Sequence, residues 1–367
     1  MIPQVEIMVL ACVVAIACSL PGVFLVLRKV SLMSDAISHA ILLGIVLSFF
    51  IVEDLASPLL LVGAALTGLL TVLLTELLIG TRKLKEDASI GLVFPIFFSL
   101  GVILISKYAG DVHLDIDAVL LGEIAFAPFD RMVVFGLDIP RSLGIMLVVL
   151  VMNLIFIALC YKELKLSTFD EGLAIALGFT PALIHYALMS MVSITAVGAF
   201  DAVGSILVVA LMIAPPATAY LLTHRLPTML ALSAAGAMAS ALIGYGLARW
   251  LDASIAGSMA MVAGALFFSA WLFAPQRGLV AQIVAHQNKK ILFSSHLLLV
   301  HLLDHEGKPE EKVENTIDNT ELHMKWKRDL TQKVITHATK EQWIVQKNNM
   351  LYLTPQGRRV SQEVMRT

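Results

Sequence analysis

Long apolar runs separated by short polar segments fill the first three quarters of the chain. A helix that spans a bilayer needs about 20 mostly apolar residues, and most of these runs approach that length. The pattern predicts nine spanning helices, or eight if one short run does not cross. The runs cover residues 5–27, 30–51, 56–79, 89–106, 141–161, 182–199, 203–223, 228–249 and 254–274. The half-apolar stretch at 107–140 predicts an outer loop with room for an interfacial or re-entrant helix.

The composition supports the same class of protein. Hydrophobic residues make up 58% of the chain and charged residues 15%, and the mean hydropathy is +0.84, whereas soluble domains carry about 25% charged residues. We therefore expect an all-α polytopic membrane domain over residues 1–280. Basic residues concentrate in cytoplasmic connections. Of the Lys and Arg between the runs, nine fall in one alternate set of connections and four in the other, which predicts an outer N-terminus and a cytoplasmic C-terminus.

Two ionisable residues interrupt the second apolar run. Asp35 and His39 are four residues apart, so they share one face of a helix. An ionisable residue inside a span is costly and usually marks an ion or substrate route, and a carboxylate with an imidazole suits a borderline divalent transition metal. The pair predicts a site of metal passage. The alternative is that the two side chains hydrogen-bond each other and hold two helices together.

The connection at 167–185 has the features of a short capped helix. Asp170 and Glu171 would complement its positive end, Gly178 would stop it, and Pro181 can open the next span. A short amphipathic helix between two spans is suited to docking on a soluble partner. The alternative is an ordinary capped loop.

The later span at 203–223 carries three further candidates. Asp201 lies at its outer start, and Pro215 and Pro216 lie in its inner half. Two consecutive prolines remove two backbone donors, so we expect the helix to bend or break and to free carbonyls that protein, water or an ion must satisfy. These residues are candidates for the pathway, with a purely structural kink as the alternative. His185 is alone on an apolar face and predicts an interior histidine with satisfied hydrogen bonds rather than a ligand.

Four segments together resemble the permease subunits of bacterial zinc, manganese and iron ABC importers. They are GVFLVLRKVSLMSDAISHAILLG at 22–44, LGEI at 121–124, FDEGLAIALGFTP at 169–181 and DAVGSILVVALMIAPPATA at 201–219. The resemblance associates Asp35 and His39 with metal passage. It also implies that the third segment is a coupling helix seated in a groove of an ATPase. The residues expected at that contact are Phe169, Asp170, Glu171, Leu173, Ala174 and Gly178.

The resemblance further implies the partners and the location. They are a second permease chain, identical or related, two ATPase chains, an extracytoplasmic metal-binding protein and the lipid of the bacterial inner membrane. The cargo would be a divalent Mn, Zn or Fe ion, with no cofactor bound permanently. The chain contains no Gly-x-x-x-x-Gly-Lys-Ser/Thr phosphate loop. We therefore expect a transport subunit and not an enzyme, with ATP hydrolysis in a partner.

The last 87 residues depart from that resemblance. Residues 281–320 predict a connecting segment, amphipathic at first and then, at 306–320, a flexible charged linker. Residues 321–367 predict helices, then two β-prone runs flanking Asn348 and Asn349 as a hairpin, then a closing helix after Pro355.

With a first helix at 296–307, this order resembles the winged-helix domain of iron-dependent repressors and predicts a small cytoplasmic α/β tail. Its core should contain Trp326, Trp343 and Leu351. Residues 281–367 hold 13 Lys and Arg against 10 Asp and Glu, so DNA stays open as a partner beside a docking or regulatory role. Four histidines in this part could sense metal, although such a scatter is typical of a surface: His296, His301, His305 and His323.

Two other functions remain open at this stage. A proton-coupled secondary metal carrier would also use intramembrane Asp and His side chains, but it would not need a coupling helix at 169–181. A membrane-tethered metal-responsive regulator would make the tail the active part of the chain.

Overall fold

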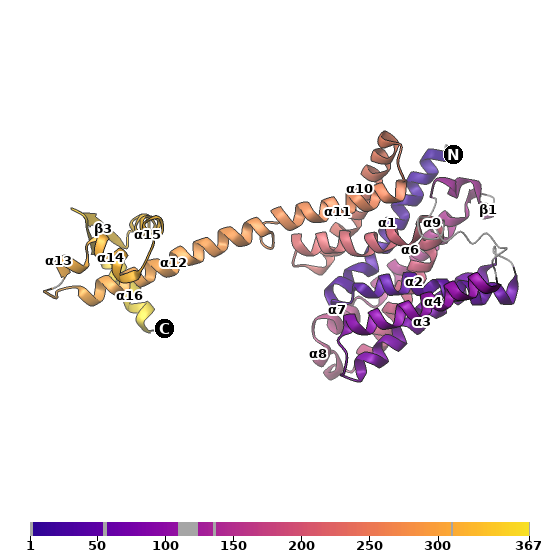
Figure 1. The fold of residues 1–367 in the computed structure, drawn as a ribbon, viewed down its shortest axis with the longest axis horizontal. Coiled ribbons are helices and arrows are strands. Elements are labelled where there is room, and N and C mark those ends of the chain that lie inside the picture. The colour runs from indigo at the N-terminus through magenta and orange to yellow at the C-terminus, as the bar shows by residue number, and fades with distance from the viewer. Residues whose placement is uncertain (1–2, 54–56, 109–123, 135–136, 310, 367) are drawn as a thin grey trace. The chain divides into compact units, whose positions relative to one another are not determined.

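The computed structural model describes residues 3–53, 57–108, 124–134, 137–309 and 311–366. The chain divides into two compact units, Met1–Ala274 and Pro275–Thr367, which are described separately (Figure 1). The boundary lies slightly before the predicted one at residue 280. Of the LGEI segment, only Ile124 falls within the described residues.

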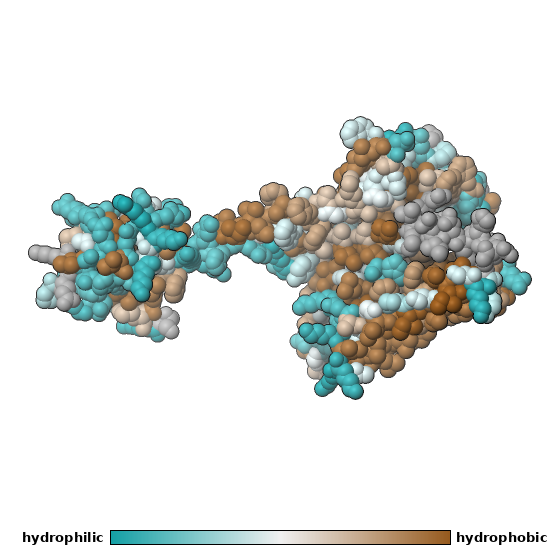
Figure 2. All heavy atoms as spheres, in the orientation of Figure 1, coloured by the Kyte–Doolittle hydropathy of each residue, from teal (hydrophilic) through white to brown (hydrophobic). Residues whose placement is uncertain are grey.

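Unit 1 is a bundle of long apolar helices. By length and composition, eight helices of the described residues could cross a membrane, which confirms the prediction of an all-α polytopic protein. Figure 2 shows hydrophobic side chains spread over the visible outer surface of these helices, as lipid contact requires. The eight are α1 (Pro3–Arg28), α2 (Leu32–Val52), α3 (Pro58–Gly80), α4 (Glu86–Tyr108), α6 (Arg141–Leu159), α9 (Pro181–Leu222), α10 (Leu226–Leu251) and α11 (Ile255–Phe273).

The helix α9 is two helical arms joined at Gly204. This glycine has φ 77° and ψ 165°, a conformation open mainly to glycine. Arg28 of α1 contacts His185 in the first arm, and Gly22 of α1 lies against Pro216 in the second arm. Gly22 and Arg28 are only about 9 Å apart along α1, whereas His185 and Pro216 would be about 46 Å apart in a straight helix. The chain must therefore fold back at Gly204, and α9 contains both runs predicted at 182–199 and 203–223.

The sequence predicted that the proline pair would bend or break the helix, and the structure shows no break there, because α9 continues through both residues. Pro215 and Pro216 are buried inside the second arm, and within α9 the non-helical backbone is at Gly204. Because Pro216 has no N–H, the carbonyl of Met212 loses its helical donor. A Cβ placed on Gly22 would lie 2.1 Å from that oxygen, so the backbone of α1 packs directly on it. A backbone C–H group this close to the oxygen partly replaces the missing hydrogen bond.

Short elements connect the spans. Between α4 and α6 the described residues form the 3₁₀ helix η1 (Ile124–Phe129) and an antiparallel hairpin of β1 (Arg131–Val134) and β2 (Leu137–Pro140). Arg131 ties this hairpin to α1, because its Nη1 donates to Glu6 Oε2 at 3.1 Å. The interfacial or re-entrant helix predicted within 107–140 falls largely on residues 109–123, which lie outside the described residues. Between α6 and α9 lie α7 (Tyr161–Phe169) and α8 (Glu171–Ala176).

Unit 2 combines helices with a β-hairpin. Asn348 and Asn349 have φ 47° and 63°, and two left-handed residues in succession form the turn that suits a two-residue hairpin loop. The predicted hairpin and closing helix are confirmed. The elements are α12 (Leu279–His305), α13 (Glu311–Glu314), α14 (Ile317–Met324), α15 (Arg328–Lys340), β3 (Ile344–Lys347), β4 (Met350–Leu353) and α16 (Pro355–Arg366).

One hydrophobic core holds unit 2 together. Leu298 and Leu302 of α12 pack with Leu351 of β4, and Trp326 and Trp343 pack against this cluster. The predicted grouping of the two tryptophans with Leu351 is therefore confirmed. Since the end of α12 supplies core residues, it belongs to the folded unit.

The predicted linker at 306–320 is part of the same fold. It contains α13 and the start of α14. Leu351 N donates to Asn315 O at 2.9 Å, and Ile317 N donates to Asn349 O at 3.3 Å. Residues 315–317 thus pair with the hairpin, which the charged composition of the segment did not indicate.

Candidate functional site

Asp35 and His39 lie together near the start of α2. His39 Nε2 is 3.4 Å from Asp35 Oδ1, and the two side chains are 29% and 39% exposed, respectively. The imidazole also contacts two rings of α4, with centroid distances of 5.8 Å to Phe94 and 5.9 Å to Phe98. The pair is therefore held in place on one side and open on the other.

Small residues on the neighbouring faces of α2 explain this orientation. Ser34 and Ser38 are buried and donate to backbone carbonyls of their own helix, at 2.9 Å each. Further along, a Cβ on Gly44 would lie 2.3 Å from the carbonyl of Gly63 in α3, so α2 and α3 pack backbone to backbone. Because these small-residue faces are turned into the bundle, Asp35 and His39 are left on the more open face.

The arrangement offers a metal ion two donors of different kinds. A carboxylate oxygen and an imidazole nitrogen suit a borderline divalent ion, and zinc normally takes four ligands. Within the described ranges, no three His, Cys, Asp or Glu side chains are grouped as metal ligands. A metal ion held by this pair would therefore need its remaining ligands from water or from another chain. The helix-bridging alternative is less well supported, because across the helix interface His39 meets phenyl rings and not a hydrogen-bond acceptor.

The short helix α8 has the predicted caps. Asp170 Oδ1 accepts a hydrogen bond from Leu173 N at 2.9 Å, which satisfies a free donor at the start of the helix. Gly178 has φ +85° after the end of the helix, and α9 begins at Pro181. Ala174 is buried, so it fixes α8 to the rest of unit 1.

The outer side of α8 is unusually apolar. Phe169 is 61% exposed, Leu173 46%, Ile175 60% and Leu177 58%. Four large exposed apolar side chains around a helix of six residues are typical of a surface that contacts another protein. Phe169 and Leu173 were expected at this surface, whereas Ile175 and Leu177 were not, although Leu173, Ile175 and Leu177 alternate with small residues in the sequence.

A polar network joins this connection to the spanning helices. Arg28 at the end of α1 donates to Ser167 Oγ at 2.8 Å and to Thr168 Oγ1 at 3.1 Å. Its Nη1 lies 3.0 Å from His185 Nδ1, and His185 Nε2 contacts Glu76 of α3. Since a guanidinium can only donate, Nδ1 accepts and Nε2 carries the proton toward Glu76. His185 thus has polar partners, as predicted, and α7 is fastened to α1, α3 and α9.

The remaining candidates lie elsewhere. Asp201 is exposed near the fold-back at Gly204, and the charges that act on it are those of Arg141 and Asp130. Pro215 and Pro216 are buried between helices. The two prolines thus serve in helix packing, and Asp201 lies next to the bend. Among the described residues, no interaction joins these three to Asp35 or His39.

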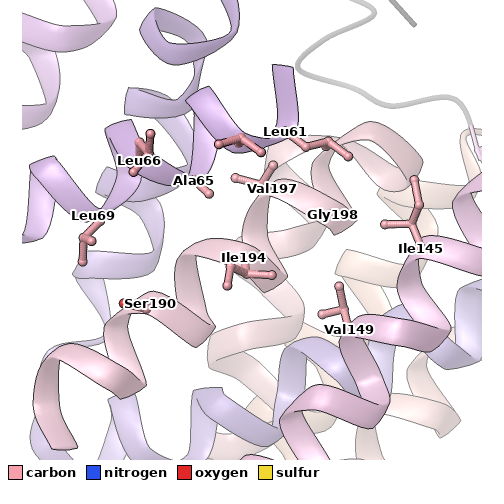
Figure 3. A pocket seen from close by; sticks show the side chains of 11 residues that line it. Leu61, Ala65, Leu66, Leu69, Ile145, Val149, Ser190, Ile194, Val197 and Gly198 are labelled. Atoms are coloured by element: carbon pink, nitrogen blue, oxygen red, sulfur yellow. The ribbon is translucent and has the colours of Figure 1, made fainter. Parts of the chain in front are cut away.

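A groove of about 400 Å³ runs between α3, α6 and α9 (Figure 3). Its lining contains no ionisable side chain, so it offers no ligand to a metal ion, and neither Asp35 nor His39 borders it. The lining residues are Leu61, Val62, Ala65, Leu66, Leu69, Ile145, Val149, Ser190, Ile194, Val197 and Gly198.

Known proteins resemble the chain along most of its length. The zinc transport system membrane protein TroD of Treponema pallidum is 48% identical over 352 residues, which is 96% of each chain. The manganese transport system membrane protein MntD of Bacillus subtilis is 49% identical over 236 residues, or 64% of this chain and 80% of that one. The solved structure of PsaBC from Streptococcus pneumoniae in complex with Fab has 31% identity and a TM-score of 0.63, covering 76% of this chain and 94% of that chain.

These matches define the family, and they limit the expectation that the last 87 residues depart from it. Because the TroD match covers 96% of both chains, it must extend through most of unit 2, so the C-terminal part does not set this chain apart from TroD. The match to the family model described as ABC 3 transport covers residues 4–274, which is nearly the whole of unit 1. The chain therefore belongs to the ABC 3 transport family.

Proposed function

We propose that the chain is the permease subunit of an ATP-driven importer of divalent transition metal ions, with unit 1 forming the route across the inner membrane. The observation that carries this proposal is the Asp35 and His39 pair, partly open on α2, in a chain of this family. The relatives are named for zinc and manganese. One carboxylate and one imidazole do not choose between these metals or iron.

The exposed surface of α8 supports coupling to a separate ATPase chain. Phe169 and Leu173 present apolar area that is not buried within the chain. If an ATPase displaced α7 and α8, the hydrogen bonds and ion pair around Arg28 and His185 would transmit that movement to the spanning helices α1, α3 and α9. A proton-coupled carrier would not need this surface. The proposed complex contains a second permease chain, ATPase chains and an extracytoplasmic metal-binding protein.

The fold-back at Gly204 supports nine crossings, because each arm of α9 is long enough to form one. An odd number puts the two ends of the membrane unit on opposite sides, which agrees with the distribution of basic residues. Unit 2 would then be cytoplasmic. Its order of helices, hairpin and closing helix supports a winged-helix-like domain, with docking or regulation as its role and DNA binding as the alternative.

Metal uptake tests the proposal. His39→Ala removes a nitrogen donor while α2 keeps its apolar packing, so we expect normal membrane levels and loss of Zn or Mn uptake. Asp35→Asn keeps the shape of the side chain and loses its charge, and it should behave alike. His286→Ala, at an exposed position of α12, is the matched control. Uptake by the His39 variant at the unmutated rate would refute the assignment.

A further inference from the structure

We infer that unit 2 carries a metal site of its own, formed by His301, His305, Glu314 and His323, that binds a borderline divalent transition metal such as Zn²⁺. This goes beyond the proposed transport function, since the site lies outside the spanning helices. His301 and His305 occupy the last turn of α12, Glu314 ends α13, and His323 lies in α14.

The three rings are spaced as ligands of one ion would be. The ring centroids of His301 and His305 are 4.4 Å apart, and those of His301 and His323 are 6.0 Å apart. Two imidazoles bound to one tetrahedral zinc ion at about 2.0–2.1 Å have centroids about 5 Å apart. The observed separations lie on either side of that value.

Each of His301 and His305 has a ring nitrogen, Nε2, that is not engaged in a hydrogen bond and could bind an ion. His305 Nδ1 lies 2.9 Å from the carbonyl oxygen of His301. His301 Nε2 is buried and has no hydrogen-bond partner. Metal-ligating histidines usually donate one N–H to a backbone carbonyl or a carboxylate, which leaves the other nitrogen for the ion. Here Nε2 is the free atom in both rings.

The Glu314 carboxylate also has a buried atom without a hydrogen-bond partner. Glu314 is 17% exposed, and its Oε2 is buried and makes no hydrogen bond. This oxygen lies 3.4 Å from His323 Nδ1, close to the separation of about 3.3 Å between two ligand atoms on one zinc ion. A buried oxygen without a hydrogen-bond donor is destabilising, and a bound cation would remove that cost.

Binding requires a small local adjustment. Among the residues that the structure describes, no three such side chains yet surround one point, so at least one histidine ring must turn inward. An ion held there would fasten α13 and α14 to α12. Asn315 directly follows Glu314 and pairs with β4. The ion would therefore also help to hold the β-hairpin in place. Unit 2 would then respond to the concentration of the transported class of ion.

The test uses the full-length chain in detergent, freed of metal by a chelator, with His39→Ala as background to weaken the membrane site. Zn²⁺ binding is measured by competition with a chromophoric chelator. Adding His305→Ala and His323→Ala should abolish one equivalent or weaken it by at least about 100-fold, whereas adding His286→Ala should change nothing. Equal stoichiometry and affinity in the two sets would overturn the inference.

A second variant guards against misfolding. Glu314→Gln keeps the shape of the side chain and removes its charge, so it should lower Zn²⁺ affinity at least about 10-fold while the chain elutes as the parent does. Co²⁺ bound to the parent should give the strong visible bands of a four-coordinate ion, and Glu314→Gln should weaken them. Unaltered bands and affinity would count against the site. Metal uptake, measured separately, tests the transport proposal, so the two can fail independently.

Discussion

The contact between Gly22 of α1 and the second arm of α9 gives a sharp test of the bundle. In Gly22→Ala the added methyl would lie 2.1 Å from Met212 O, 3.0 Å from Met212 C and 3.0 Å from Pro216 Cγ. A carbon and a carbonyl oxygen normally approach to about 3.3 Å, so the two helices would have to separate by roughly 1 Å. The obstacle is backbone, and it cannot rotate away as a side chain could.

Overpacking of a core typically costs about 1–3 kcal/mol, and occasionally more. Since Gly22 and Met212 both lie in buried parts of their helices, we expect Gly22→Ala to reach about 3 kcal/mol. This corresponds to roughly a 150-fold shift of the folded fraction. Gly246→Ala in α10 is the matched control, because nothing lies within 4 Å of the added Cβ. There alanine should stabilise the helix by up to about 1 kcal/mol.

The measurement is unfolding of the full chain in mixed micelles with increasing denaturing detergent. Pro216→Ala restores an N–H that can draw the Met212 carbonyl back into the helix. The double variant with Gly22→Ala should therefore lose less stability than the sum of the single variants. If Gly22→Ala unfolds at the same detergent concentration as the parent and Gly246→Ala, then the close packing of α1 on α9 is wrong.

Three further predictions follow from the other contacts. Arg28→Met removes the donors to Ser167, Thr168 and His185, so ATPase activity should persist without coupled uptake in proteoliposomes; tight coupling would contradict the role of the network. Leu173→Asp places a charge on the exposed face of α8 and should abolish co-purification of the ATPase, and full retention would exclude this face. The lowered pKa of His301 means that the unfolded chain binds the proton more readily, so unit 2 should lose stability as the pH falls below about 6.5. Proteolysis across that range checks this, and a His301→Asn variant with the same pH dependence would contradict it.

Much of the architecture follows from local pattern. Apolar runs of span length became helices because no other structure satisfies the backbone in lipid. Asp170 and Gly178 predicted both ends of α8 through their capping chemistry, and Asn348 with Asn349 predicted the hairpin because both tolerate left-handed backbone. In each case the physical cause lies within a few residues of the effect.

The features that the sequence did not reveal depend on distant partners. Arg28 meets Ser167 and His185 across 139 and 157 positions, and no spacing rule reaches that far. The proline pair predicted a bend or a break, and the helix continues through it where α1 packs on the freed carbonyl of Met212. The chain turns at Gly204, close to the boundary predicted between the apolar runs at 182–199 and 203–223, although only Asp201 and Ser205 mark the turn in the sequence.

The short turn at Gly204 has a consequence for biogenesis. In the proposed topology of nine crossings, no hydrophilic loop separates the two arms of α9, so they would enter the bilayer together as a helical hairpin. A residue that disfavours φ 77° would favour one continuous helix of 42 residues, about 63 Å long and twice the thickness of the hydrocarbon core. One crossing would then replace two, and every later segment, unit 2 included, would be delivered to the opposite side of the membrane. In that topology, a single glycine without a side chain decides whether the number of crossings is odd or even.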